Sequence, residues 1–107
     1  MPDSVRTAQL FLENLFAGDY AKAADSFDPA LRSHVNDQTL STVWKQVTSL
    51  FGKPLKHTGT RTSRTISASA DIIYLSWDFE KERVDARIVV NRANRVVGAA
   101  FETPVIK

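Results

Sequence analysis

Two histidines are the side chains of this sequence best suited to proton transfer near neutral pH. His34 stands beside Val35 in a short polar stretch, and His57 lies in a run of threonines and basic residues. A histidine that acts as a general base needs a carboxylate to orient its ring, and Asp37 is placed to cap a helix instead. We therefore expect His34 to lie at a helix end, and we assign catalysis to neither histidine.

Asp78 is the carboxylate whose neighbours make it a candidate for acid-base chemistry. It lies between Trp77 and Phe79, and apolar surroundings favour the protonated form of a carboxylate, which can then donate its proton. Side chains alternate between the two faces of a strand, however, so Asp78 should point away from the apolar row of its own strand. We expect a solvated or dimer-facing aspartate.

Basic residues form a strip with no aromatic residues between them, at Lys53, Lys56, Arg61 and Arg64. Nucleic-acid surfaces gather basic residues on one face, and those that bind single strands add aromatic rings for the bases. Charge on an edge strand also prevents aggregation, and that is the simpler explanation here. The formal net charge is only +2, so we expect no nucleic-acid partner.

Several classes of site have no counterpart in the sequence. There is no cysteine, which rules out disulfides and thiolate metal sites, and there is no H-E-x-x-H, phosphate-binding glycine loop or nucleophile elbow. We expect no metal and no cofactor. No apolar run is long enough to span a membrane, and the first residues lack the features of a secretory signal. We expect a cytoplasmic protein, although a leader removed earlier would leave no trace.

Aromatic residues are the best candidates for lining a pocket. Trp44 should project from a helix toward a sheet, Trp77 and Phe101 belong to the apolar rows of that sheet, and Tyr20 should pack with its hydroxyl at the rim. With His34 they form the predicted lining, if the space between helix and sheet stays open. In a filled core the same aromatic residues would simply pack together.

Residues 71–102 contain three alternating runs separated by two polar turns, which predicts a three-stranded antiparallel meander. Because successive strand residues point to opposite faces, each run divides into two rows. The more apolar row should face the core, and it comprises Ile73, Leu75, Trp77, Phe79, Val84, Ala86, Ile88, Val90, Val97, Ala99 and Phe101.

The opposite row of the meander is mixed in character, with Tyr74, Val89 and Ala100 beside Arg87. A fully solvated row would be more polar, so we expect another chain to cover this face in part. These four residues are the predicted contacts of a homodimer. The pattern leaves open whether the covering chain is a second copy or a different protein.

Helices should precede the sheet. Apolar residues at helical spacing predict a helix from Val5 to Phe16 that ends at Gly18, and then a short helix capped by Asp19. Asp28 and Pro29 should start a brief helical turn. A third helix, capped by Asn36 or Asp37 and stopped by Gly52 and Pro54, should bury one stripe on the core face of the meander: Leu40, Val43, Trp44, Val47, Leu50 and Phe51.

Residues 55–66 should add an edge strand bent near Gly59, and residues 67–70 should form a loop. Helices gathered on one side of an antiparallel sheet make an α+β fold. We therefore predict one domain over residues 1–107, with N-terminal helices packed on a bent four-stranded antiparallel sheet, a cystatin-like cone.

Four stretches carry a resemblance to a known family: LFAGDYAKA at 15–23, FDPAL at 27–31, VWKQVTSLFGKP at 43–54 and FEKERVDARIVVNRANRVVGAAFETP at 79–104. They resemble the nuclear transport factor 2-like superfamily, and within it the branch catalogued as domain of unknown function 3887. The resemblance implies a bent sheet wrapped around helices, a pocket at the wide end and frequent dimers. The superfamily holds isomerases, dehydratases and cyclases as well as non-catalytic modules, and no catalytic residue carries over.

The function that we expect is a non-catalytic domain that binds a small apolar molecule or another protein. The alternatives are a small isomerase, dehydratase or cyclase with an ionisable group in the cone, and a purely structural dimerisation module. A cavity of a few hundred cubic ångströms, and the presence or absence of an ionisable group in it, would separate the three.

Overall fold

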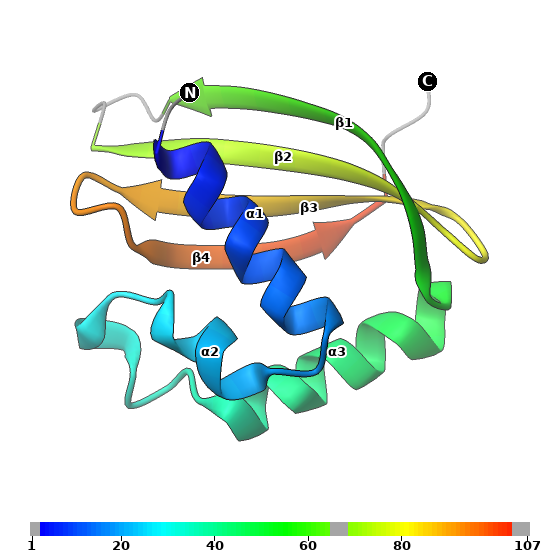
Figure 1. Cartoon of the computed structure of the whole chain (residues 1–107), viewed down its shortest axis with the longest axis horizontal. Coiled ribbons are helices and arrows are strands. Elements are labelled where there is room, and N and C mark those ends of the chain that lie inside the picture. Colours follow the sequence, from blue (N-terminus) through cyan, green and yellow to red (C-terminus); the bar gives the residue numbers. More distant parts are fainter. Residues whose placement is uncertain (1–2, 65–68, 104–107) are drawn as a thin grey trace.

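A computed structural model describes residues 3–64 and 69–103 of the chain. Helices come first and four antiparallel strands follow in the order β1-β2-β3-β4, which confirms the predicted α+β fold. The predicted strand end at Ile66 and the start of the loop at Ser67 lie outside the described residues. The elements, drawn in Figure 1, are α1 (Asp3–Phe16), α2 (Tyr20–Asp25), the 3-10 turn η1 (Pro29–Leu31), α3 (Asp37–Phe51), β1 (Pro54–Arg64), β2 (Ala70–Phe79), β3 (Arg83–Asn91) and β4 (Val96–Glu102).

Local chemistry explains where the helices begin and end. The Asp19 side chain accepts a hydrogen bond from the backbone of α2, and Asn36 caps α3 in a reciprocal capping box with Thr39. Gly18 and Gly52 follow α1 and α3 with φ of +79° and +82°, a backbone region that costs glycine no steric strain. The predicted caps and stops are thus confirmed, and Asn36 rather than Asp37 is the cap of α3.

The layering of the helices differs from the prediction. Figure 1 shows α1 running across one face of the sheet, and α1 packs against β2 and β3. We expected α3 to take that place. Instead α3 packs on α2 and reaches the sheet through aromatic residues, since Trp44 and Phe51 both contact the ring of Phe79.

The apolar stripe of α3 is therefore only partly buried. Leu40, Trp44 and Val47 are in the core, but 43% of Val43 and 68% of Leu50 are exposed, contrary to prediction. Because α1 occupies the centre of the sheet, α3 has too little apolar surface opposite it to cover its whole stripe.

One β-bulge changes the facing of side chains in β4. Val90 of β3 pairs with Val96, whereas the preceding Val89 pairs with Gly98, so Val97 is an extra residue in the ladder. Val96 is consequently buried and 36% of Val97 is exposed. The prediction that Val97 belongs to the core row is wrong, because simple alternation does not hold across a bulge.

Strand β1 is an edge strand that pairs only with β2, as predicted. The register of the pair shifts between His57 and Gly59, where a bend was expected. A second shift lies between Pro54 and Lys56. These irregularities let β1 curve around the sheet, as Figure 1 shows.

Candidate ligand-binding site

A cavity of about 370 Å³ lies between η1, α3 and β4, next to the C-terminal half of α1. Aliphatic and aromatic residues dominate its lining, and only two lining residues have polar side chains. The lining consists of Phe11, Leu15, Phe27, Leu31, His34, Val35, Thr39, Leu40, Val43, Val97, Gly98, Ala99 and Phe101.

The cavity exists because no helix covers the inner face of β4. In β3, Ala86 and Ile88 are buried. Their cross-strand partners in β4 are not, since Phe101 is half-buried and Ala99 is exposed. Helix α1 packs on β2 and β3, and α3 stands away from the sheet on the far side of the cavity. A hollow therefore remains under β4.

Aromatic contacts shape the inner end of the cavity. Phe11 and Phe27 meet edge to face with ring centroids 5.4 Å apart. Phe101 contacts the ring of Trp44 at 5.8 Å, and Trp44 in turn stacks on Phe16 at 5.0 Å. Trp44 is thus packed next to a lining residue without belonging to the lining itself.

Main-chain hydrogen bonds join the segment just before η1 to β4. Val96 donates to the carbonyl of Ser26 at 2.8 Å, and its own carbonyl accepts from the Asp28 amide at 2.9 Å. The Asp28 carboxylate accepts from the Ala30 amide at 3.0 Å and from Asn91 Nδ2 at 2.8 Å. These two bonds, in that order, lower the pKa of Asp28 below its usual value.

His34 and Thr39 are the polar residues of the lining. The Thr39 hydroxyl donates to the Asn36 carbonyl and accepts from the Asn36 amide, both at 2.9 Å, so its hydrogen-bonding capacity is used within the cap of α3. The His34 side chain, by contrast, has no hydrogen-bond or ion-pair partner among residues 3–64 and 69–103. No described lining residue is acidic.

The predicted pocket residues do not all meet at one place. His34 and Phe101 line the cavity, and Trp44 touches Phe101 from outside it. Tyr20 packs against the core at the start of α2. Trp77 lies in a different pocket, of about 200 Å³, between α1 and the sheet.

That second pocket is polar, and in it the His57 ring stacks on the Trp77 ring. The two rings stack with centroids 5.4 Å apart, and His57 Nε2 lies 2.8 Å from the Gly59 carbonyl oxygen. Gln9 and Glu13 complete the α1 side of the pocket. His57 is thereby positioned by its own strand and stays exposed.

Sequence reasoning missed the aliphatic part of the lining. Val43 was expected to lie under the sheet, yet it borders the cavity, as does Val35. Ala99 was assigned to the core row of its strand. The sequence did contain one signal for the cavity, the run of small residues from Gly98 to Ala100. Small side chains cannot fill the space between a strand and a helix that lies opposite it.

The opposite face of the sheet, which we call the outer face, has no helix on it in the view of Figure 1. Its central row is Arg61, Tyr74, Arg87 and Ala100, which are paired across the four strands in that order. Val89 follows in the next row, paired with Ile72. The four predicted dimer contacts are therefore neighbours on one face.

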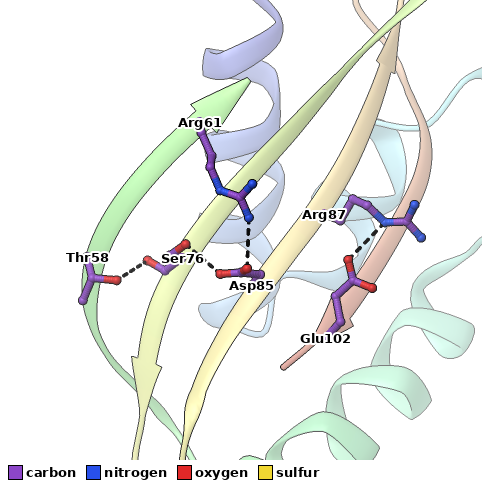
Figure 2. A network of polar contacts seen from close by, with 6 residues as sticks. All are labelled: Thr58, Arg61, Ser76, Asp85, Arg87 and Glu102. Atoms are coloured by element: carbon purple, nitrogen blue, oxygen red, sulfur yellow. Dashed lines mark hydrogen bonds and ion pairs between the residues drawn. The ribbon is translucent and has the colours of Figure 1, made fainter. Parts of the chain in front are cut away.

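A carboxylate is buried at the centre of the outer face. Only 7% of Asp85 is exposed, and it accepts hydrogen bonds from Ser76 Oγ at 2.7 Å and from Arg61 Nη2 at 3.3 Å (Figure 2). Thr58 Oγ1 donates to the Ser76 carbonyl at 3.2 Å and links β1 to the network. Alternation placed Asp85 in the mixed row but did not predict that it would be buried.

Two further contacts involve the arginines of the same face. Arg87 Nε lies 3.4 Å from Glu102 Oε1, within ion-pair range but outside hydrogen-bonding geometry, and Figure 2 shows the two side chains beside each other. The Arg61 guanidinium also lies over the Tyr74 ring, 4.3 Å from its centroid. Asp78, which lies nearer the end of β2, accepts from Arg83 Nε at 3.0 Å, and both side chains are well exposed.

Within the described part of the chain, no helix is long and apolar enough to cross a membrane, and no group of three or more His, Cys, Asp or Glu side chains could hold a metal ion. A comparison with known families finds one match: the model of the family described as "Protein of unknown function (DUF3887)" covers residues 8–98. No curated protein and no solved structure matches the chain significantly. Because the family match extends from α1 into β4, the chain belongs to the DUF3887 family.

Proposed function

We propose that this chain is a non-catalytic binding domain of the nuclear transport factor 2-like kind, which holds a small apolar molecule in the cavity under β4. The observation that carries the proposal is the cavity itself. Its volume of about 370 Å³ lies at the lower end of the range typical of ligand pockets, and nearly all of its lining is apolar.

The same lining argues against catalysis. His34 is the only described lining residue that could exchange a proton, and no lining carboxylate is available to orient it. An isomerase or dehydratase would need such a partner inside the cavity. A structural module with a filled core would leave no cavity, so binding is the function that best fits this site.

Fluorescence of N-phenyl-1-naphthylamine tests the proposal, because this uncharged probe brightens when it enters apolar surroundings. We expect saturable binding to the wild type. The variant Ala99→Trp should lose most of this binding, since an indole on the inner face of β4 fills the cavity. A wild type that does not bind the probe, or an Ala99→Trp variant that binds it equally well, would overturn the proposal.

Ala100→Trp is the matched control. It introduces the same side chain one residue later in β4, where Ala100 belongs to the outer face and does not line the cavity. Because the cavity lies within one chain, this variant should bind the probe like the wild type even though Ala100 is one of the predicted dimer contacts. The pair of variants thus separates filling of the cavity from any general effect of a tryptophan in β4.

We also propose that the outer face joins two copies of the chain in a homodimer. The supporting observation is that Arg61, Asp85, Arg87 and Glu102 already pair within one chain and sum to zero charge. Burying charges that are already paired costs less than burying isolated ones. The half-buried Tyr74, Val89 and Ala100 supply apolar area next to them.

Sedimentation velocity tests the dimer. Tyr74→Glu and Val89→Lys should each give a folded monomer, because either places an unpaired charge in the contact. Leu50→Lys, on an exposed position of α3, is the control and should leave the dimer intact. A wild type that sediments as a monomer at high concentration would overturn the dimer without affecting the cavity.

A further inference from the structure

We infer that the ligand of the cavity is an apolar monocarboxylate, whose carboxylate binds at His34 while its hydrocarbon part lies between α3 and β4. This inference rests on the proposed binding function and specifies the ligand class. It follows from which polar groups the cavity offers and which it lacks.

His34, a solvent-exposed residue of the lining, supplies the hydrogen-bond donor that no described residue uses. Its side chain has no partner in the described part of the chain, whereas the Thr39 hydroxyl is engaged by Asn36 as both donor and acceptor. A ligand that enters the cavity therefore finds one free polar side chain, which can donate an N–H in either charge state. Such a site selects a molecule with a single acceptor group.

Among the described residues, the lining itself contains no acidic side chain that would repel an anion. A hydrogen bond to an ionised acceptor is stronger than one between two neutral groups.

The remainder of the cavity accepts only an apolar group. Leu31 and Val43 line the cavity from η1 and α3, and Val35 lines it from the segment between them. Ala99 and Phe101 line it from β4. A second polar group on the ligand would be desolvated there without a partner, which is costly. Molecules with several hydroxyl groups, such as sugars, are therefore disfavoured relative to a short fatty acid.

Displacement of N-phenyl-1-naphthylamine by octanoate and by octan-1-ol tests the inference, because the two compounds share a chain and differ in the head group. We expect octanoate to displace the probe from the wild type about 5 to 10 times more effectively than octan-1-ol does. His34→Leu should remove this preference, because displacement by octanoate should weaken far more than displacement by octan-1-ol. His34→Gln, which keeps an uncharged donor, should retain part of it.

The second histidine of the chain provides the control. His57 lies on β1 outside the cavity, and His57→Leu should keep the full preference for octanoate. Equal displacement by octanoate and octan-1-ol, or a preference that survives His34→Leu, would overturn the inference while leaving the binding function intact. A wild type that binds neither the probe nor the two compounds would overturn both.

Discussion

The side chains of the inner and outer faces of the sheet are stabilised in different ways. On the inner face, Ile73, Leu75 and Ile88 are almost completely buried under α1. On the outer face, charged side chains pair with one another, and the buried Asp85 has a hydroxyl and a guanidinium as partners. The inner face depends on cover by other elements, and the outer face depends on contacts within the sheet.

This difference explains where the cavity and the proposed dimer contact lie. Where the cover of the inner face ends, at β4, apolar side chains remain exposed to a hollow and can accept an apolar molecule. The outer face needs no helix of its own chain over it, because its charges are already paired within the sheet. The two faces are thus suited to two different partners, and substitutions on each face should have separable effects.

Trp44→Ala should have the largest effect, because it removes the side chain through which α3 contacts the rings of Phe16, Phe79 and Phe101. We expect the free energy of unfolding to fall by about 3–5 kcal/mol in urea denaturation. Leu50→Ala on the same helix, at an exposed position, is the control and should change it by no more than about 0.5 kcal/mol. Equal losses from the two variants would show that α3 does not pack as described.

The inner face should respond differently under α1 and under the cavity. Ala86→Leu in β3 adds volume to a filled core, and we expect a loss of about 1–3 kcal/mol in the free energy of unfolding. Ala99→Leu makes the same change on the same face of β4, where the cavity has room, and should cost no more than about 0.5 kcal/mol. Thermal denaturation of both variants measures the contrast. A costly Ala99→Leu would mean that the hollow is filled.

On the outer face, Asp85→Ala should cost about 1–3 kcal/mol in the free energy of unfolding, because it leaves Ser76 and Arg61 without their buried acceptor. Asp78→Ala removes a carboxylate from an exposed ion pair with Arg83 and should cost no more than about 1 kcal/mol. Urea denaturation compares the two. If Asp78→Ala proved the more costly, the buried network of Figure 2 would not be what stabilises this face.

The smallest expected effect concerns Asp28, in the segment that main-chain hydrogen bonds join to β4 beside the cavity. The pKa of Asp28 is lowered in the folded chain from the ordinary value of 3.8, because the ionised carboxylate accepts from Ala30 and Asn91. A depressed pKa contributes stability above the unfolded value, and this contribution is lost as the pH falls through the folded value. Asp28→Asn should therefore be slightly less stable than the wild type at neutral pH, and the difference should shrink as the pH falls below 3.8 and vanish once the pH is below the lowered pKa of the folded chain. A difference that grows in acid would contradict this assignment.

Much of the fold could be predicted because local chemistry determines it. The caps at Asp19 and Asn36, the stop at Gly18 and the edge strand bent near Gly59 each depend on residues that are close together in the chain. The core rows of β2 and β3 likewise follow from simple alternation, because no bulge interrupts their pairing.

The cavity could not be predicted in the same way, because it depends on contacts between distant segments. The bulge at Val97 accompanies the bridge between Val96 and Phe27, which lies far away in the sequence. An apolar stripe also shows that a helix buries one side, but it does not show whether α1 or α3 takes the centre of the sheet. The burial of Asp85 has the same origin, since it requires Arg61 from another strand.

The most direct test of the central claim is to locate a bound apolar molecule by nuclear magnetic resonance, with methyl-labelled protein and N-phenyl-1-naphthylamine. We expect intermolecular nuclear Overhauser effects from the probe to the methyl groups of Val35, Val43 and Val97, which line the cavity, and none to Val89 on the outer face. Effects confined to Val89, or to the exposed Leu50 and Leu55, would place the apolar site elsewhere and contradict the account.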